Sequence, residues 1–249
     1  MTGLADFIPT LLGVGLLTAL TTLVLWGFRA PHRFAPALAI VRGTAQLAAI
    51  SFVLSGVITS PVWVGVALSV MFTVAAVTAA RRIRWSLRHF ALVSGAMASG
   101  ITITLIIVFA TGAIAFTPRY ALAIGGIVIG NAMTVATLAG RRFIESVDER
   151  WDEVEGWLAL GATPRQSTIH LARSAIYSAL IPSTDQTKTT GLVTLPGAFV
   201  GAIFGGVSPL AAGRFQIMVL ASIMAAGSIT AVIVISVLAP VRVRPTVLE

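Results

Sequence analysis

The fold is decided by two adjacent stretches of opposite character, RYALAIGGIVIGNAMTVATLA (residues 119–139) and RRFIESVDERWDEVEGWLALGATPRQSTIHLAR (Arg141–Arg173). The first is apolar and has about the 20 residues that a helix needs to cross a bilayer. The second is polar and holds six of the nine acidic residues of the chain. A protein that is apolar elsewhere and gathers its acidic side chains in one segment is expected to use that segment to meet a soluble partner.

The composition indicates an integral membrane protein. Of 249 residues, 57% are hydrophobic and 10% are charged, and the mean hydropathy is +0.95, whereas soluble domains carry about 25% charged residues. The net charge of +8 does not indicate nucleic-acid binding, because the arginines lie in short loops between apolar runs. The chain has no cysteine, which excludes disulfides and thiolate chemistry.

Seven apolar runs are predicted to be membrane spans, and the fold class is therefore all-α, polytopic and confined to one domain over residues 1–249. Pro196 lies inside the sixth run and predicts a kink there. The seven predicted spans are 8–27, 35–58, 61–80, 90–111, 119–139, 187–207 and 214–238.

The arginines predict the orientation of these spans. With seven crossings, thirteen arginines fall on one side and only Arg119 and Arg214 fall on the other. Because positively charged loops stay in the cytoplasm, we expect a multi-pass protein of the cell membrane with its N-terminus outside and its C-terminus inside. The cytoplasmic set is Arg29, Arg33, Arg81, Arg82, Arg84, Arg88, Arg141, Arg142, Arg150, Arg165, Arg173, Arg242 and Arg244.

The polar segment, taken as about residues 141–175, carries apolar side chains at helical spacing from Phe143 to Trp157, with acidic residues between them. Gly161 is expected to end this amphipathic helix, and Thr163 followed by Pro164 is expected to start the next one. Such a helix could lie on the membrane surface or dock sideways on a partner. Helices on membrane surfaces are usually basic and this one is acidic, which favours docking.

No catalytic set is evident, so we do not expect an enzyme. His32, His89 and His170 lie near predicted helix ends and are not spaced as metal ligands. Lys188 is the only lysine, and no phosphate-binding GxxxxGK[ST] pattern precedes it. Any ATP must therefore be hydrolysed on another chain, and the residues of a metal site are unknown.

The candidate transport residues are the polar ones at membrane depth. Arg42 and Gln46 lie one helical turn apart in the second predicted span and so share a face. Arg42 either lines a pathway or extends its side chain to the headgroups. Asn131, in the fifth span, either lines the same pathway or bonds to a neighbouring helix.

Asp185 and Lys188 flank the cytoplasmic entry of the sixth predicted span, three residues apart. One alternative is that they form a local ion pair. The other is that Asp185 neutralises Arg42 across the interface. Pro196 completes the set, since a break in a span often borders a transport pathway.

Five motifs occur in order along most of the chain: RGTAQL (42–47), IGNAM (129–133), EGWLALGATP (155–164), LIPSTDQTKTTGLVTLPG (180–197) and GGVSPLAAGRFQIMVL (205–220). Together they give the chain a resemblance to the FetB-type permease family of ABC transporters. The resemblance implies a permease that pairs with a separate ATPase, which binds ATP and magnesium, and that exports iron. The segment EGWLALGA is similar to the loop by which such permeases dock on the ATPase, and it implies coupling roles for Glu155, Leu158, Leu160, Gly161, Ala162 and Pro164.

One segment departs from the family pattern. Residues 196–203 read PGAFVGAI where the family commonly has PGMMTGQI, so residues able to bind metal are replaced. An ABC permease for a non-metal solute therefore stays open, as does a secondary transporter or channel that needs no ATPase. A single chain of this length is expected to form a homodimer, because pairing supplies a two-fold pathway.

Overall fold

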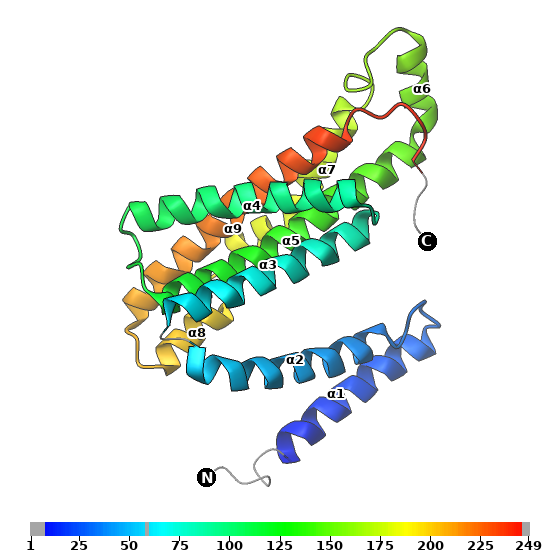
Figure 1. Ribbon diagram of the computed structural model, residues 1–249. Helices are drawn as coiled ribbons and strands as arrows, with labels where there is room; N and C mark the ends of the chain where they lie inside the picture. The colour runs from blue at the N-terminus through cyan, green and yellow to red at the C-terminus, as the bar shows by residue number, and fades with distance from the viewer. Residues whose placement is uncertain (1–7, 58–59, 246–249) are drawn as a thin grey trace. The chain divides into compact units, whose positions relative to one another are not determined.

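The computed structural model describes residues 8–57 and 60–245, and all of its regular elements there are helices (Figure 1). The helices form two compact units, which divide near residue 58 and are described separately. The first unit is a pair, α1 (Ile8–Gly27) and α2 (Ala35–Val57). The connection between them contains Arg29 and His32, both with positive φ.

The second unit is a bundle of five long helices with two short ones at its ends. The long helices are α3 (Pro61–Ile83), α4 (Leu87–Ala110), α5 (Pro118–Glu149), α7 (Ile169–Thr189) and α9 (Pro209–Leu238). The short helices are α6 (Trp151–Ala159) and α8 (Gly197–Phe204).

Local sequence explains where three of the long helices begin. Proline occupies the first turn of α3, α5 and α9, where its missing N–H costs nothing. Thr117 and Ser208 precede two of these prolines, and their hydroxyls accept bonds from the N–H groups of Tyr120 and Ala211, both at 3.3 Å.

Small residues let the bundle helices approach closely. A Cβ atom added to Gly100 of α4 would lie 2.6 Å from the carbonyl oxygen of Ala226 in α9, and one added to Gly140 of α5 would lie 2.7 Å from Ile83 in α3. Without a hydrophobic drive between helices in lipid, such close packing is the main source of their association. The bundle core is rich in alanine and valine for the same reason.

Five helices are long and apolar enough to cross a membrane: α1, α3, α4, α5 and α9. They match the first, third, fourth, fifth and seventh predicted spans. Helix α2 covers the second predicted span up to Val57, and residue 58 lies outside the described residues.

The sixth predicted span, 187–207, is wrong. Helix α7 ends at Thr189, residues 190–196 form a turn, and α8 contributes only eight residues before Gly205. Gly191 and Gly206 both have φ +88, a left-handed conformation that interrupts a helix. Pro196 marks the start of α8 rather than a kink within a span.

Helix α7 takes the place of the sixth span within the bundle. Its buried residues include Ala172, Ala175 and Ala179, which pack with α5 and α9. It begins beside the end of α9, because the Thr168 hydroxyl donates to the carbonyl oxygen of Ala239 at 2.7 Å. It therefore runs antiparallel to α9.

Candidate functional site

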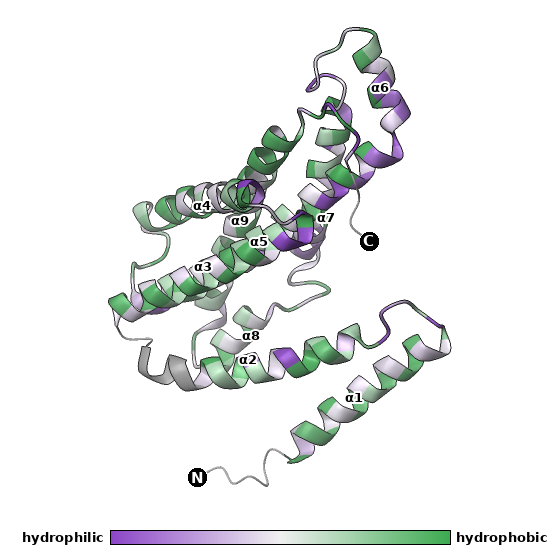
Figure 2. Cartoon of the chain, turned by 45° about the vertical axis from the view of Figure 1, so that its right-hand side comes forward, coloured by the Kyte–Doolittle hydropathy of each residue, from purple (hydrophilic) through white to green (hydrophobic). Residues whose placement is uncertain are grey.

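The acidic segment forms one projecting end of the bundle, which we name the α6 tip (residues 151–168; Figure 2). Helix α5 continues past the predicted fifth span to Glu149, and Arg150, with φ −115° and ψ 33°, breaks it from α6. Phe143, Val147 and Val154 are buried. The predicted amphipathic pattern is therefore present, but it is divided between the end of α5 and α6.

Gly161 ends α6 as predicted. Its φ is +90, and the N–H groups of Gly161 and Ala162 donate to the carbonyl oxygens of Leu158 and Trp157, both at 3.0 Å. These two bonds form a Schellman cap, in which the left-handed residue is usually glycine. A side chain at position 161 would meet no steric neighbour but would strain the backbone.

The predicted helix start at Thr163 and Pro164 is only half right. The Thr163 N–H donates to the Gln166 Oε1 at 2.9 Å, and the Gln166 N–H donates to the Thr163 hydroxyl at 3.3 Å. This reciprocal pair is a capping box. Residues 164–168 nevertheless form turns, and α7 begins at Ile169.

The α6 tip presents apolar side chains beside acidic ones. Leu160 is 83% exposed and Trp157 is 50% exposed, and both border a hollow of about 700 Å³ together with Glu153 and His170. The Nε2 of His170 lies 3.2 Å from the Glu153 Oε1. Of the predicted coupling residues, Glu155, Leu160 and Gly161 are exposed, and Leu158, Ala162 and Pro164 are half-buried.

Two contacts between distant residues, which the sequence did not predict, hold this end of the bundle together, and one of them anchors the α6 tip. The buried bond from Thr168 to Ala239 ties its last residue to the end of α9. The Arg244 Nε donates to the Asp148 Oδ1 at 2.6 Å, which joins the C-terminal tail to α5 and raises the pKa of Arg244. Nothing in the local sequence pairs residues so far apart.

Arg42 and Gln46 lie on α2 one turn apart, as predicted, and both are exposed. They belong to the α1–α2 unit. Asn131 lies on α5, is half-buried, and donates from Nδ2 to the Ile127 carbonyl oxygen at 2.9 Å. Asn131 therefore bonds within its own helix and not to a neighbouring helix, which was one of the two predicted roles.

Asp185 and Lys188 form a local ion pair of 3.5 Å in the last turns of α7, with both side chains more than half exposed. The sequence placed Asp185 at the cytoplasmic entry of the sixth predicted span, on the same side as the acidic segment, and the structure does not place these two at the same end of the bundle. Sixteen residues of helix separate Asp185 from Ile169, which is roughly 24 Å. It therefore lies toward the end of the bundle opposite the α6 tip. Pro196 follows beyond α7 at that same end.

A buried polar side chain went unnoticed in the sequence. Gln216 of α9 is 5% exposed, and its Oε1 has no hydrogen-bond partner among the described residues. Its position inside an otherwise apolar run could have identified it from the sequence. In the part of the chain that the structure describes, no group of three His, Cys, Asp or Glu residues could hold a metal ion.

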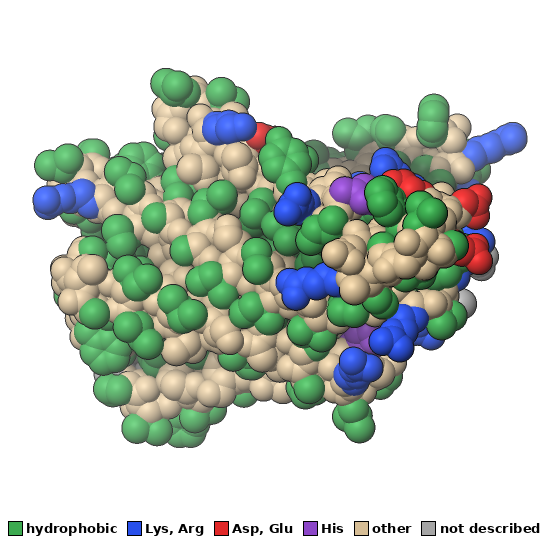
Figure 3. Space-filling model, turned by 90° about the horizontal axis from the view of Figure 1, so that it is seen from above, with side chains coloured by type: hydrophobic (Ala, Val, Ile, Leu, Met, Phe, Trp, Pro, Cys, Tyr) green, Lys and Arg blue, Asp and Glu red, His purple; other side chains and the backbone are tan. Residues whose placement is uncertain are grey.

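Charged side chains gather at the same end of the bundle as the α6 tip (Figure 3). Arg82 at the end of α3 and Arg141 of α5 line one pocket there, so α3 ends beside the part of α5 that leads to the α6 tip. Tyr120 and Phe215 stack at 5.6 Å, which brings the starts of α5 and α9 together at the other end. Arg119 and Arg214 lie within the first two turns of these helices, so within the bundle the predicted sorting of arginines holds.

Comparison with known proteins identifies relatives over most of the chain. Residues 9–241 match the model of a family described as Uncharacterised protein family (UPF0014). The UPF0014 membrane protein STAR2 of Oryza sativa subsp. japonica is 40% identical over 199 residues, which are 78% of this chain and 69% of that protein. The Protein ALUMINUM SENSITIVE 3 of Arabidopsis thaliana is 35% identical over 78% of this chain and 71% of its own length.

A bacterial relative confirms the resemblance to FetB-type permeases. The protein named Probable iron export permease protein FetB of Escherichia coli (strain K12) is 36% identical over 159 residues, which are 64% of this chain and 61% of that protein. No solved structure matches the chain.

Proposed function

Because the chain belongs to the UPF0014 family of membrane proteins, we propose that it is the membrane subunit of an ABC transporter. In this proposal two copies form a homodimer, and each copy docks on a separate ATPase subunit that binds ATP and magnesium. The cargo is a metal, with iron the leading candidate because of the name of the FetB relative.

The observation that carries the proposal is the α6 tip. It projects beyond the bundle, exposes Trp157 and Leu160 beside acidic side chains, and ends in a glycine cap that fixes its direction. An apolar anchor surrounded by charges is the usual centre of a protein interface. Helices that instead lie on anionic membranes are rich in Lys and Arg.

The anchoring of the α6 tip supports a coupling role. The tip continues directly from α5, leads directly into α7, and is bonded to the end of α9 through Thr168. A displacement applied to Leu160 or Trp157 by a partner would therefore reach α5 through the junction at Arg150, and α7 and α9 through the capped turns of residues 160–168. This is what a protein needs in order to convert ATP hydrolysis elsewhere into movement of its own helices.

The proposed orientation places the N-terminus outside the cell and the α6 tip and the C-terminus in the cytoplasm. The arginine sorting within the bundle supports it, since Arg119 and Arg214 mark the end opposite the tip. Replacing the predicted sixth span with α7 leaves the number of crossings unchanged. The orientation argument therefore survives that correction.

Two alternatives remain distinct from this proposal: an ATPase-independent secondary transporter or channel, and an ABC permease for a non-metal solute. One reconstitution separates all three. The full chain is co-expressed with a candidate ABC ATPase from the same organism, purified, placed in liposomes, and assayed for ATP hydrolysis against a panel of metal ions.

We expect a stable complex whose hydrolysis rises with iron, and a smaller rise in Arg42→Ala if Arg42 lines the pathway. Arg33→Ala, which removes an arginine outside the helices, is the matched control. Failure to form any complex with an ATPase would support the first alternative. A complex that responds to no metal would support the second. Equal stimulation in Arg42→Ala and the parent would leave Arg42 as an interfacial anchor.

A further inference from the structure

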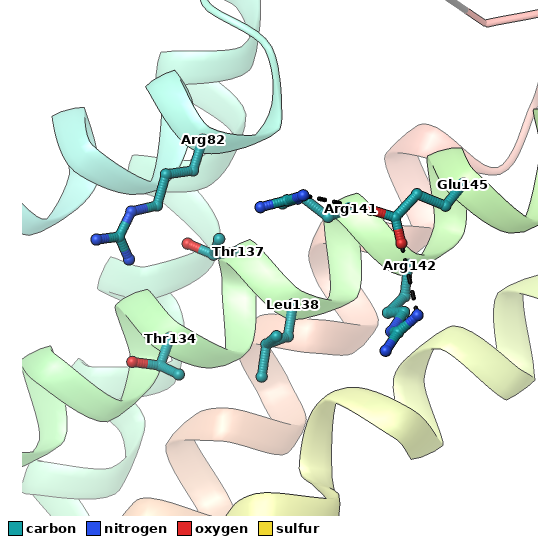
Figure 4. Close-up of a pocket in the computed structure, with 7 residues that line it drawn as sticks. All are labelled: Arg82, Thr134, Thr137, Leu138, Arg141, Arg142 and Glu145. Carbon is teal, nitrogen blue, oxygen red and sulfur yellow. Dashed lines mark hydrogen bonds and ion pairs between the residues drawn. The ribbon is translucent and has the colours of Figure 1, made fainter. Parts of the chain in front are cut away.

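A basic pocket of about 440 Å³ lies between α3 and α5 at the same end of the bundle as the α6 tip (Figure 4). We name it the α3–α5 pocket. It is separate from the hollow at the α6 tip and contains none of the predicted transport or coupling residues. Its lining consists of Arg82 from α3 and of Thr134, Thr137, Leu138, Arg141, Arg142 and Glu145 from α5.

The charges of this pocket favour an anion. Glu145 is shared between Arg141 at 3.5 Å and Arg142 at 3.6 Å, and all three side chains contact solvent. Among the described residues no acidic group lies within ion-pair distance of Arg82. Three guanidinium groups and one carboxylate leave the pocket with a net charge of +2. Guanidinium groups bind phosphate oxygens through paired N–H bonds.

The surface next to the pocket favours a lipid chain. Along α3, Val74 and Thr78 precede Arg82 at four-residue spacing and so lie near the same face. Val74 is 55% exposed, and the Thr78 hydroxyl is already bonded to the Val74 carbonyl oxygen at 2.7 Å. On α5, Leu138 forms part of the pocket wall on the apolar side of the arginines. The exposed surface therefore changes from basic to apolar within two helical turns.

We propose that the α3–α5 pocket binds the phosphate group of an anionic phospholipid in the leaflet nearest the α6 tip, with an acyl chain along Val74 and Leu138. Basic pockets between membrane helices on the cytoplasmic side suit such headgroups. A soluble phosphate-bearing molecule would share the same chemistry at the arginines. It would gain nothing from the apolar surface, so the two sources can be told apart.

The test measures lipid binding to the full chain in detergent by native mass spectrometry, with phosphatidylglycerol and phosphatidylcholine as probes. We expect the parent to retain phosphatidylglycerol in preference, and the double variant R82Q/R141Q to bind it about tenfold or more weakly. The matched control is R84Q/R88Q. It removes the same charge from exposed arginines at the same end of the bundle but outside the pocket, and it should bind as the parent does.

Three results would overturn the proposal. Equal weakening in both double variants would mean that only the general surface charge attracts the lipid. Displacement of phosphatidylglycerol by millimolar inorganic phosphate would assign the pocket to a soluble phosphate compound. If R82Q/R141Q does not fold, R82K/R141K serves instead, because lysine keeps the charge but lacks the paired donors. Unchanged binding in that variant would contradict the arginine–phosphate geometry.

Discussion

The two ends of the α3–α9 bundle use the same turn chemistry for different surroundings. At one end α6 stops at Gly161 with φ +90, and at the other α7 is followed by Gly191 with φ +88. The α6 tip is acidic and is tied to the end of α9 by Thr168, and Arg244 of the C-terminal tail bonds to α5 just before the tip. The turn after α7 is held by backbone bonds between Thr189, Thr194 and their neighbours.

The exposed side chains of the two ends differ accordingly. Leu192 is 92% exposed, Val193 is 78% exposed and Phe204 is 86% exposed, with no acidic residue from 190 to 208. The α6 tip instead exposes Leu160 and Trp157 at a hollow that Glu153 also lines. Left-handed glycines therefore set the direction of the chain at both ends, whereas the side chains around them decide what each end can contact. The uncharged segment 190–208 suits lipid or a second copy, and the acidic, anchored end suits a soluble protein.

The largest expected effect comes from giving both glycines the same side chain. Gly161→Val and Gly191→Val each place a β-branched residue in a left-handed conformation, at a cost of roughly 1–2 kcal/mol, and neither meets a steric neighbour. We expect Gly161→Val to abolish co-purification of the ATPase, because the cap directs the α6 tip, and Gly191→Val to preserve it. Loss of the complex in both variants would show that strain, and not the position of the tip, is responsible.

A second substitution tests the bundle that connects the two ends without altering either. Gly100→Ala places a Cβ 2.6 Å from the backbone oxygen of Ala226, which cannot move aside, and we expect a loss of about 1–3 kcal/mol of stability. Gly95→Ala on the same helix meets nothing within 4 Å and is the control. Thermal unfolding in detergent should separate the two variants by several degrees. Equal unfolding temperatures would contradict the close contact of α4 with α9.

The smallest expected effect concerns the anchor of the α6 tip. Thr168→Val keeps the shape of the side chain but leaves the carbonyl oxygen of Ala239 without its buried donor, at a cost of about 1–2 kcal/mol. Thr189→Val is the control, because that hydroxyl is exposed and bonds within its own helix. We expect only Thr168→Val to lower the unfolding temperature, and to speed hydrogen exchange at the start of α7. Equal hydrogen-exchange rates at the start of α7 in the two variants would contradict the role of Thr168 as an anchor.

Much of the architecture was readable from local sequence. Apolar length located α1, α3, α4, α5 and α9, because a helix must span the membrane with its own hydrogen bonds. The glycine after an amphipathic run located the end of α6, since few other residues adopt that conformation without strain. The sorting of arginines also survived within the bundle, because α7 leads from the end of the α6 tip to the opposite end, as the predicted sixth span was expected to do.

The tertiary structure alone decided the role of residues 169–208. Hydropathy favoured 187–207 as a span, yet the helix that packs in the bundle is α7. This helix contains many polar residues, and it is held in place because Ala172, Ala175 and Ala179 pack on α5 and α9. That change moved Asp185 and Lys188 to the opposite end of the bundle. The bond from Thr168 to Ala239 and the meeting of Arg82 with Arg141 join residues far apart in the chain. Periodicity reports only which face of a helix is apolar, whereas contacts between distant segments depend on which helices pack together.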